Sequence, residues 1–206
     1  GKYDAIIAAM VITDKRKEVV GFTYPYAVGT RTFVVAKSGT LGQIPMDDKV
    51  YNLGTDEAGT RKAVDALKPM LKGKVLAAQT STTNATFLEK YFGDVATVRE
   101  YKTAEQIILD LNSGRIDAIF DGIAFLGGTL RADEGKGLTM VGPKFIGGIF
   151  GHGSAIAVRK SDTDLRDKIN AALKTMVADG TLKQLSEKWF HVDISPTAQD
   201  GWGVVE

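Results

Sequence analysis

The fold is decided by the opening stretch of the chain, Gly1-Lys-Tyr-Asp-Ala-Ile-Ile-Ala-Ala-Met-Val-Ile-Thr-Asp-Lys-Arg16. The apolar run at residues 5–10 predicts a short strand that is covered on both faces, as in a parallel sheet. Thr13 and Asp14 then predict a turn into a brief helix that carries Arg16. Backbone N–H groups at a strand end, beside a planar guanidinium, suit a carboxylate because two parallel charge-assisted bonds fix its position and plane. The spacing also fits an ordinary arginine on a solvated helix face, and it does not decide between the two interpretations.

The composition excludes several classes of protein. The 206 residues are 44% hydrophobic and 25% charged, which is typical of a globular chain with a core in one or two compact units. The net charge of +1, with acids and bases interspersed, gives no basic stripe for nucleic acid. No apolar run is long enough for insertion into a membrane. Because the chain has no cysteine and two isolated histidines, His152 and His191, we expect no metal site and no cofactor.

Strands and helices alternate along the rest of the chain. A long connection at residues 38–73 contains a predicted helix at residues 56–67. The other predicted strands are residues 30–36, 75–78, 97–101, 118–120 and 154–158, and the other predicted helices are residues 85–92, 104–113, 123–130, 162–178 and 182–189. The apolar residues of the last helix that we expect to pack inward are Leu182, Leu185, Trp189 and Phe190. This order predicts a mostly parallel sheet with right-handed crossovers.

Two loops between these elements stand out. Ligands of parallel sheets bind at the carboxyl ends of the strands, and residues 79–84 form a turn from such a strand end into a helix. The hydroxyl side chains and N–H groups of this turn fit an anion site at a helix N-terminus, although plain N-capping explains the same residues equally well. Residues 147–153 contain four glycines, but their spacing does not fit a phosphate-binding loop, and no Lys-Ser or Lys-Thr follows them.

The opening stretch closely resembles the signature of the type 2 periplasmic amino-acid-binding proteins, which feed bacterial ABC importers. The residues in register with that signature are Asp4-Ala5-Ile6-Ile7, Ile12-Thr13, Arg16 and Phe22-Thr23-Tyr24-Pro25-Tyr26. Further matches, which extend over nearly the whole chain, are Gly73-Lys74-Val75, Gln79-Thr80-Ser81-Thr82, Ser113-Gly114-Arg115-Ile116-Asp117-Ala118, Gly142-Pro143, Val158-Arg159-Lys160, Asp179-Gly180-Thr181 and Trp189-Phe190.

The resemblance implies an α/β, periplasmic-binding-protein-like fold with two lobes, mostly parallel sheets and two hinge crossings. Lobe 1 is expected at residues 1–29 and 152–206, and lobe 2 at residues 30–151. The second crossing falls on the glycine-rich residues 147–153, where glycine permits the backbone change of hinge closure. Members of the family carry further elements of lobe 1 before this signature. We therefore expect lobe 1 to be incomplete here, with residues 5–10 as a bare edge strand.

The implied function is that of a periplasmic solute-binding protein. Such a protein closes two lobes around an amino acid or an opine-like derivative and delivers it to the permease of an ABC transporter. By position, Arg16 would clamp the ligand carboxylate, helped by the backbone N–H groups of Val11 and Thr82. The other positions that the resemblance implies for ligand binding are Ala9, Ser81, Thr83, Asp121 and Gly122.

Three positions depart from the pattern of proteins that bind free α-amino acids. Such proteins usually hold the ligand ammonium with a hydroxyl residue at position 11 and a carboxylate at position 122, whereas this chain has Val11 and Gly122, with Asp121 one place earlier. A shift of one residue on a strand turns a side chain to the other face, so the sequence does not decide whether Asp121 reaches the ligand. Together with the long connection at residues 38–73, the departures favour an N-substituted, opine-like ligand. A basic amino acid (lysine, arginine or histidine) is the alternative.

Two other classes of protein share this architecture. An enzyme of the same fold, such as a cyclohexadienyl dehydratase, needs a positioned acid or base. Asp121 is the one plausible candidate in the matched motifs, so we expect the chain not to be an enzyme. The effector-binding domain of a regulator would normally follow a helix-turn-helix, for which this sequence has no pattern.

Overall fold

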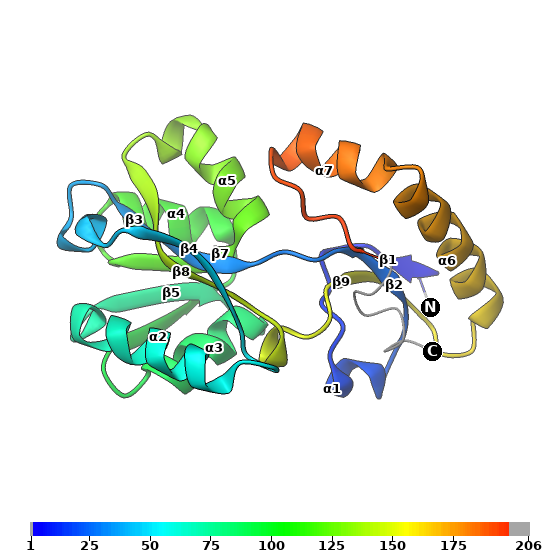
Figure 1. The fold of residues 1–206 in the computed structure, drawn as a ribbon, viewed down its shortest axis with the longest axis horizontal. Helices are drawn as coiled ribbons and strands as arrows, with labels where there is room; N and C mark the ends of the chain where they lie inside the picture. The colour runs from blue at the N-terminus through cyan, green and yellow to red at the C-terminus, as the bar shows by residue number, and fades with distance from the viewer. Residues whose placement is uncertain (1, 198–206) are drawn as a thin grey trace. The chain divides into compact units, whose positions relative to one another are not determined.

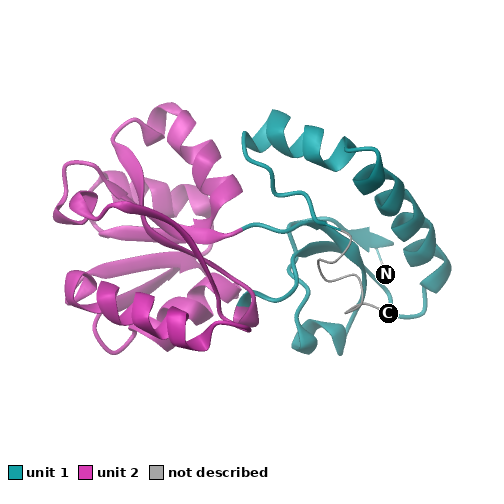
Figure 2. Ribbon diagram, in the orientation of Figure 1, with its two compact units in different colours: residues 1–29, 150–206 teal, residues 30–149 magenta. Residues whose placement is uncertain are grey.

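The computed structural model describes residues 2–197 of the chain, and Figure 1 labels its helices and strands. The chain divides into two compact units, which Figure 2 shows in different colours. Unit 1 comprises Gly1–Gly29 and Phe150–Glu206, and unit 2 comprises Thr30–Ile149. The chain therefore passes between the units twice, once after Gly29 and once before Phe150.

Unit 2 is built on a six-stranded sheet with the strand order β4-β8-β3-β7-β5-β6. Its strands are β3 (Arg31–Ala36), β4 (Met46–Asn52), β5 (Val75–Gln79), β6 (Thr97–Tyr101), β7 (Ala118–Gly122) and β8 (Leu138–Ile146). The pairings of β4 with β8, β5 with β6 and β5 with β7 are parallel, and β3 is antiparallel to both of its neighbours. The prediction of a mostly parallel sheet is confirmed for this unit.

Helices cover this sheet, and several begin at a side-chain cap. The α-helices of unit 2 are α2 (Glu57–Leu71), α3 (Thr83–Phe92), α4 (Ala104–Asn112) and α5 (Ile123–Arg131), and the short 3-10 helices are η1 (Thr40–Gln43), η2 (Asp133–Gly135) and η3 (Gly148–Phe150), the last of which ends in unit 1. Asp56, Thr82 and Thr103 each accept a hydrogen bond from the backbone N–H three residues later. A cap of this kind stabilises a helix by about 1 kcal/mol. These caps explain why α2, α3 and α4 begin within two residues of their predicted starts.

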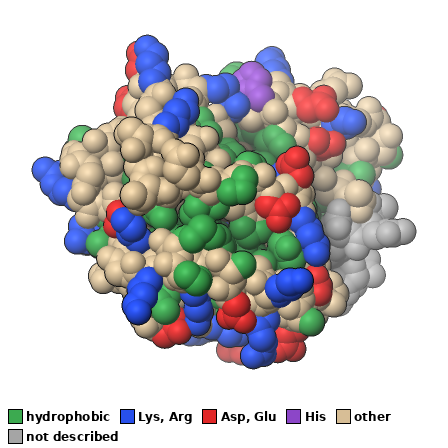
Figure 3. All heavy atoms as spheres, turned by 60° about the vertical axis from the view of Figure 1, so that its left-hand side comes forward, with side chains coloured by type: hydrophobic (Ala, Val, Ile, Leu, Met, Phe, Trp, Pro, Cys, Tyr) green, Lys and Arg blue, Asp and Glu red, His purple; other side chains and the backbone are tan. Residues whose placement is uncertain are grey.

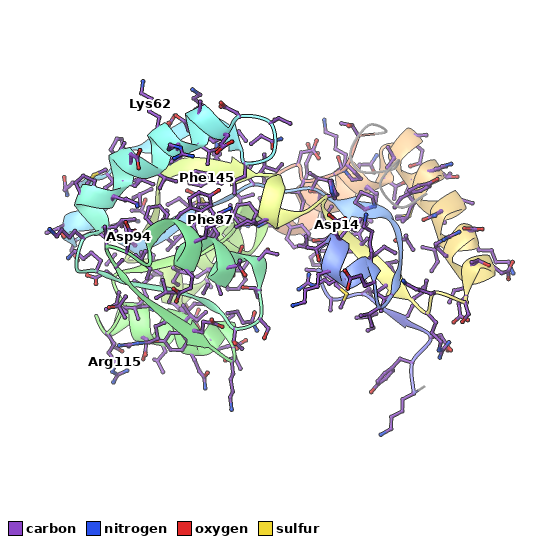
Figure 4. The ribbon with its side chains drawn as sticks, turned by 90° about the horizontal axis from the view of Figure 1, so that it is seen from below. Asp14, Lys62, Phe87, Asp94, Arg115 and Phe145 are labelled. Atoms are coloured by element: carbon purple, nitrogen blue, oxygen red, sulfur yellow. The ribbon has the colours of Figure 1, made fainter. Side chains whose placement is uncertain are left out.

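Phenylalanine rings fill the centre of unit 2. The fully buried rings are Phe33, Phe87, Phe92, Phe120 and Phe145. The Phe87 ring stacks on Phe120 with 4.6 Å between the ring centroids and contacts Phe145 at 4.9 Å. Figure 4 shows Phe87 and Phe145 side by side in the interior of the unit. Because buried aromatic rings dominate the energetics of a core, these contacts fix α3 against β7 and β8.

Unit 1 contains, within residues 2–197, an antiparallel sheet with the strand order β1-β9-β2. Its strands are β1 (Ala5–Ile6), β2 (Gly21–Ala27) and β9 (Ser154–Val158), and its helices are α1 (Asp14–Lys17), α6 (Thr163–Ala178) and α7 (Thr181–Phe190). Ile12 and Phe22 belong to one buried apolar cluster. Tyr24 packs with Leu173 of α6 and Leu182 of α7 in a second cluster. The sheet therefore carries apolar contacts to both α6 and α7.

The strand predicted at residues 5–10 is shorter than expected, because β1 ends at Ile6. The prediction that it is covered on both faces, as in a parallel sheet, is also wrong, because β1 is exposed and pairs antiparallel with β9. Ala9 has a φ of +50°, a left-handed backbone conformation that interrupts extended pairing. The chain rejoins the sheet through an isolated antiparallel bridge between Val11 and Ser154. The opening stretch is therefore a kinked strand end and not a continuous strand.

Two strands of unit 2, β4 and β8, are missing from the predicted elements. The pair Gly142-Pro143 resembles a turn, because Pro143 has no N–H to donate and Gly142 has a φ of +77°. In the structure, Thr32 Oγ1 on β3 lies 2.9 Å from the carbonyl oxygen of Val141 and 3.0 Å from that of Pro143. This contact from a neighbouring strand holds the irregular segment in the sheet. The charged sequence of β4 suits an edge strand, where charge opposes pairing with other chains.

The inward packing predicted for the last helix is wrong for three of its four residues. Leu182 is buried, but the exposed fractions of Leu185, Trp189 and Phe190 are 41%, 66% and 43%. The buried polar residue on this helix is Ser186, whose Oγ donates to the carbonyl of Val192 and accepts from the N–H of residue 194. The side of α7 that faces the protein interior therefore includes the hydrogen-bonded Ser186, and the spacing of apolar residues in the sequence does not predict this.

Residues 2–197 contain neither a helix suited to span a membrane nor a cluster of metal-ligating side chains. No helix among these residues is long and apolar enough to cross a bilayer. The same residues contain no group of three or more His, Asp or Glu side chains arranged to hold a metal ion. Figure 3 shows Lys and Arg interspersed with Asp and Glu on the face that it displays, in line with the net charge of +1.

Two glycines of unit 2 give a matched test of backbone strain. A Cβ at Gly128 or at Gly114 would meet no heavy atom within 4 Å, but Gly114 has a φ of +69° whereas Gly128 lies within α5. We expect Gly128→Ala to stabilise unit 2 by about 0.5–1 kcal/mol, because alanine is the better helix former. We expect Gly114→Ala to destabilise it by about 1 kcal/mol through left-handed strain. Urea denaturation of both variants checks the two signs, and equal effects would contradict this backbone explanation.

Candidate ligand-binding site

Arg16 in unit 1 is held against the end of the kinked strand. Its guanidinium Nη1 donates a hydrogen bond of 2.9 Å to the carbonyl oxygen of Val11. The backbone N–H of Arg16 donates to Thr13 Oγ1 at 3.3 Å, so Thr13 caps the short helix α1. The side chain of Arg16 is half-buried. The bond to Val11 uses one of the five N–H donors of the guanidinium and fixes its position.

Ala9, two residues before Val11, has a strained backbone. Left-handed geometry costs an alanine roughly 1 kcal/mol, and its φ is +50°. Its N–H donates to Tyr26 Oη at 3.0 Å, and Ser154 Oγ donates to its carbonyl at 3.3 Å. Burial raises the pKa of Tyr26. Because such strain persists where the surrounding structure enforces it and is frequent at ligand sites, Ala9 is a functional candidate.

Three residues of the predicted site in unit 2, Ser81, Thr82 and Thr83, lie at the turn from β5 into α3. Ser81 is exposed and has a φ of +60°, so it is a second strained position. Thr82 Oγ1 donates to the carbonyl of Gln79 at 2.6 Å and accepts from the N–H of Ala85 at 3.3 Å. Thr83 is the first residue of α3. The first N–H groups of a helix have no partner within it and carry the positive end of its dipole, so this turn suits an anionic group.

Asp121 lies near the carboxyl end of β7, next to the same turn. Its Oδ1 accepts hydrogen bonds from Asn84 Nδ2 at 2.8 Å and from the N–H of Gly122 at 2.6 Å. Burial raises the pKa of Asp121, while these two bonds and the charge of Arg31 act in the opposite direction. Burial lowers the pKa of Arg31 to about 10, against the attraction of Asp121. The two hydrogen-bond donors of the Asp121 carboxylate, Asn84 and Gly122, therefore both belong to unit 2.

Gly122 caps the N-terminus of α5 and has an ordinary φ of −67°. A Cβ at this position would meet no heavy atom within 4 Å. Neither packing nor backbone geometry therefore requires a glycine at position 122. The space that a longer side chain would occupy remains open on this side of β7.

The predicted residues form one group in each unit. Ala9, Val11 and Arg16 lie together in unit 1, and the group in unit 2 is Ser81, Thr82, Thr83, Asp121 and Gly122. Asn84 and Arg31, which contact or face Asp121, are missing from the predicted set. The sequence feature that could have identified Asn84 as a site residue is its place in the polar stretch at residues 79–84. No sequence pattern connects Arg31 with Asp121, because β3 and β7 are distant in sequence.

Comparisons with known proteins agree on one family. Residues 1–94 and 95–192 match the bacterial extracellular solute-binding proteins, family 3. The octopine-binding periplasmic protein of Rhizobium meliloti is 35% identical over 95% of this chain and 72% of its own length. An ancestral arginine-binding protein bound to arginine superposes with a TM-score of 0.71 at 30% identity, over 92% of this chain and 73% of the other.

A second solved structure supports the same assignment. It is a periplasmic His/Glu/Gln/Arg/opine family-binding protein from Silicibacter pomeroyi in complex with lysine, with a TM-score of 0.68 and 31% identity. The match covers 96% of this chain and 74% of the other. The likeness to these structures confirms the predicted α/β, periplasmic-binding-protein-like fold.

The opposite pKa shifts of two aspartates in unit 2 predict opposite effects of pH. Burial raises the pKa of Asp121, so this group holds its proton more tightly in the folded protein than in the unfolded chain. Its contribution to the free energy of unfolding therefore falls as pH rises above the unfolded pKa of about 3.9. The pKa of Asp94 is lowered by its hydrogen bond to Lys68, whose Nζ lies 2.7 Å away, so that its stabilisation is lost as pH falls. Figure 4 labels Asp94.

We expect the stability of Asp121→Asn relative to wild type to increase between pH 3 and pH 7, and that of Asp94→Asn to decrease over the same range. Urea denaturation at several pH values measures both differences, and all other groups cancel in the comparison with wild type. A falling difference for Asp121→Asn would contradict the assignment of a raised pKa.

Proposed function

Because the chain belongs to the bacterial extracellular solute-binding proteins, family 3, we propose that it binds an amino acid or an opine-like derivative for an ABC importer. The observation that carries this proposal is the arrangement at Arg16, whose guanidinium is anchored on the Val11 carbonyl at 2.9 Å. An anchored guanidinium loses less conformational freedom when it binds a carboxylate, so its two parallel hydrogen bonds are more effective. The proposed role of Arg16 is to bind the carboxylate of the ligand.

The turn at the start of α3 is the proposed second anchor. Its strained Ser81, with a φ of +60°, and its capping residue Thr82 precede the N–H groups of the first helical turn. Such groups bind oxygen atoms of an anion without needing a charged side chain. Ser81, Thr82 and Thr83 therefore suit a carboxylate or another acceptor-rich group of the ligand. Strain at both Ala9 and Ser81 supports the same assignment.

The positions that hold a ligand amine favour an N-substituted ligand. Val11 has no hydroxyl group, and the open space at Gly122 contains no carboxylate. A buried ammonium without acceptors is costly. An alkylated amine that pairs with a second carboxylate of its own molecule needs fewer acceptors from the protein. The relative from Rhizobium meliloti, which carries octopine binding in its name, supports this ligand class.

A basic amino acid is the second candidate ligand. Two of the solved structures that resemble this chain hold arginine and lysine. For such a ligand the protein would need an acceptor for the α-ammonium, and Asp121 is the nearest carboxylate in sequence to position 122.

The proposed role is binding and not catalysis. Catalysis by a carboxyl group needs a proton that is free to transfer to the substrate. Asp121 instead bonds to Asn84 and Gly122. We propose a periplasmic location and a permease partner on the basis of the family, and we expect saturable binding without turnover of prephenate or arogenate.

Substitution of the arginine tests the proposed function directly. We expect Arg16→Ala to weaken ligand binding by a hundredfold or more, about 2.7 kcal/mol, because a charge-assisted bidentate contact is lost. The matched control is Lys15→Ala, which removes the charge of an adjacent, exposed residue of α1. Calorimetric titration measures both variants. Equal affinities for wild type and Arg16→Ala would contradict the assignment.

Competition between ligands tests the ligand class. We expect octopine or nopaline to bind at least about tenfold more tightly than arginine, lysine or histidine, which corresponds to roughly 1.4 kcal/mol. The physical reason is the cost of burying a free α-ammonium with too few acceptors. Displacement titrations give the ratio, and free arginine binding as tightly as octopine would replace this ligand class with basic amino acids.

A further inference from the structure

The side chain of Asn84 is buried although one of its polar atoms has no hydrogen-bond partner, an arrangement that does not favour folding. Asn84 is the second residue of α3 and is 8% exposed. Its Oδ1 is buried without a hydrogen-bond partner, while its Nδ2 donates to Asp121 Oδ1 at 2.8 Å. A buried amide oxygen without a donor is costly and uncommon in native proteins. Such a cost is expected where a residue is kept for its function.

The contact of Asn84 joins the ends of two neighbouring strands. Strands β5 and β7 are parallel, with Leu76 opposite Ala118 and Ala77 opposite Ile119. Their carboxyl ends therefore meet at the same edge of the sheet, where ligands of such sheets bind. The start of α3, which follows the turn after β5, contributes Asn84, and the end of β7 contributes Asp121. The amide therefore lies at the edge to which the proposed function assigns the ligand.

Two N–H donors and one cation already act on the Asp121 carboxylate. Oδ1 already accepts from both the Asn84 amide and the Gly122 N–H. Arg31, opposite Gly122 on β3, supplies a positive charge that acts on Asp121. An ammonium group that approached Oδ1 would compete with these groups for the same oxygen. The carboxylate one residue before position 122 is therefore not equivalent to a free acceptor.

We propose that Asn84 determines ligand specificity by holding the Asp121 carboxylate as a structural anion, so that this carboxylate is not available to the ammonium group of a free amino acid. The inference rests on the proposed function and deepens it, because it names the residue that disfavours a free α-ammonium. In this role Asn84 is a positioning residue that acts through Asp121. The favoured ligand class is an amine that is substituted and paired within its own molecule.

The experiment compares ligand preference among variants of unit 2. Asn84→Leu removes the amide with little change in size, and the double variant Asn84→Leu, Asp121→Asn also removes the carboxylate. The matched control is Asn112→Leu, which removes an exposed asparagine amide of α4 that bonds to the carbonyl of Glu134. Calorimetric titrations with arginine and octopine give the ratio of the two affinities for each protein.

We expect Asn84→Leu to shift this ratio about tenfold toward arginine, because the released carboxylate can accept the ammonium. The shift should disappear in the double variant, since the acceptor is then absent. Asn112→Leu should leave the ratio at the wild-type value. An unchanged ratio in Asn84→Leu, an equal loss of both affinities, or a shift that persists in the double variant would each overturn the inference.

A measurement without ligand separates this inference from the proposed function. The 13C chemical shift of the Asp121 carboxyl is followed against pH in wild type and in Asn84→Ser, a smaller variant to be used if Asn84→Leu does not fold. Loss of the amide donor should raise the titration midpoint, because that bond favours the charged form. An unchanged midpoint would overturn the inference. Failure of wild type to bind either ligand, with a raised midpoint in the variant, would instead contradict the proposed function.

Discussion

The parallel pairing of β5 with β7 is the constraint on which the candidate site of unit 2 depends. It brings the carboxyl ends of two strands together, although 37 residues separate Asn84 from Asp121. The pairing is stabilised from one side by the stacked rings of Phe87 and Phe120, which fix α3 on the sheet. The position of the polar turn before α3 therefore follows from the packing of the aromatic core.

Backbone strain marks the candidate groups of both units. Of the three non-glycine residues with positive φ among residues 2–197, Ala9 and Ser81 lie among the residues that the resemblance implies for ligand binding, and the third, His191, ends α7. Neither residue prefers a left-handed conformation, so contacts with the surrounding structure must enforce it. One such contact is the hydrogen bond from the Ala9 N–H to Tyr26 Oη. This strain is an observation of geometry that is independent of the family resemblance.

The predictions from sequence succeeded where the signal was local. Strand β6 and the start of α4 lie where the sequence predicts them, and Thr82 caps α3 from within the turn at residues 79–84. They failed where distant residues decide: Thr32 retains Gly142-Pro143 in β8, and Ser186 takes the inward side of α7 through a bond to Val192. The residues of the site were predicted through motifs, and the sequence contains no motif for the contact of Asn84 with Asp121.

By itself, the sequence determined the family, the α/β order of the elements and the place of Arg16 after a strand end, because these depend on short stretches and their caps. The tertiary structure decided the environment of Asp121. A shift of one residue could place its carboxylate on either face of the sheet, and only the pairing of strands distant in sequence brings Asn84 and Arg31 to it. Hydrogen bonding and burial at such a site depend on three-dimensional neighbours, which no local pattern encodes.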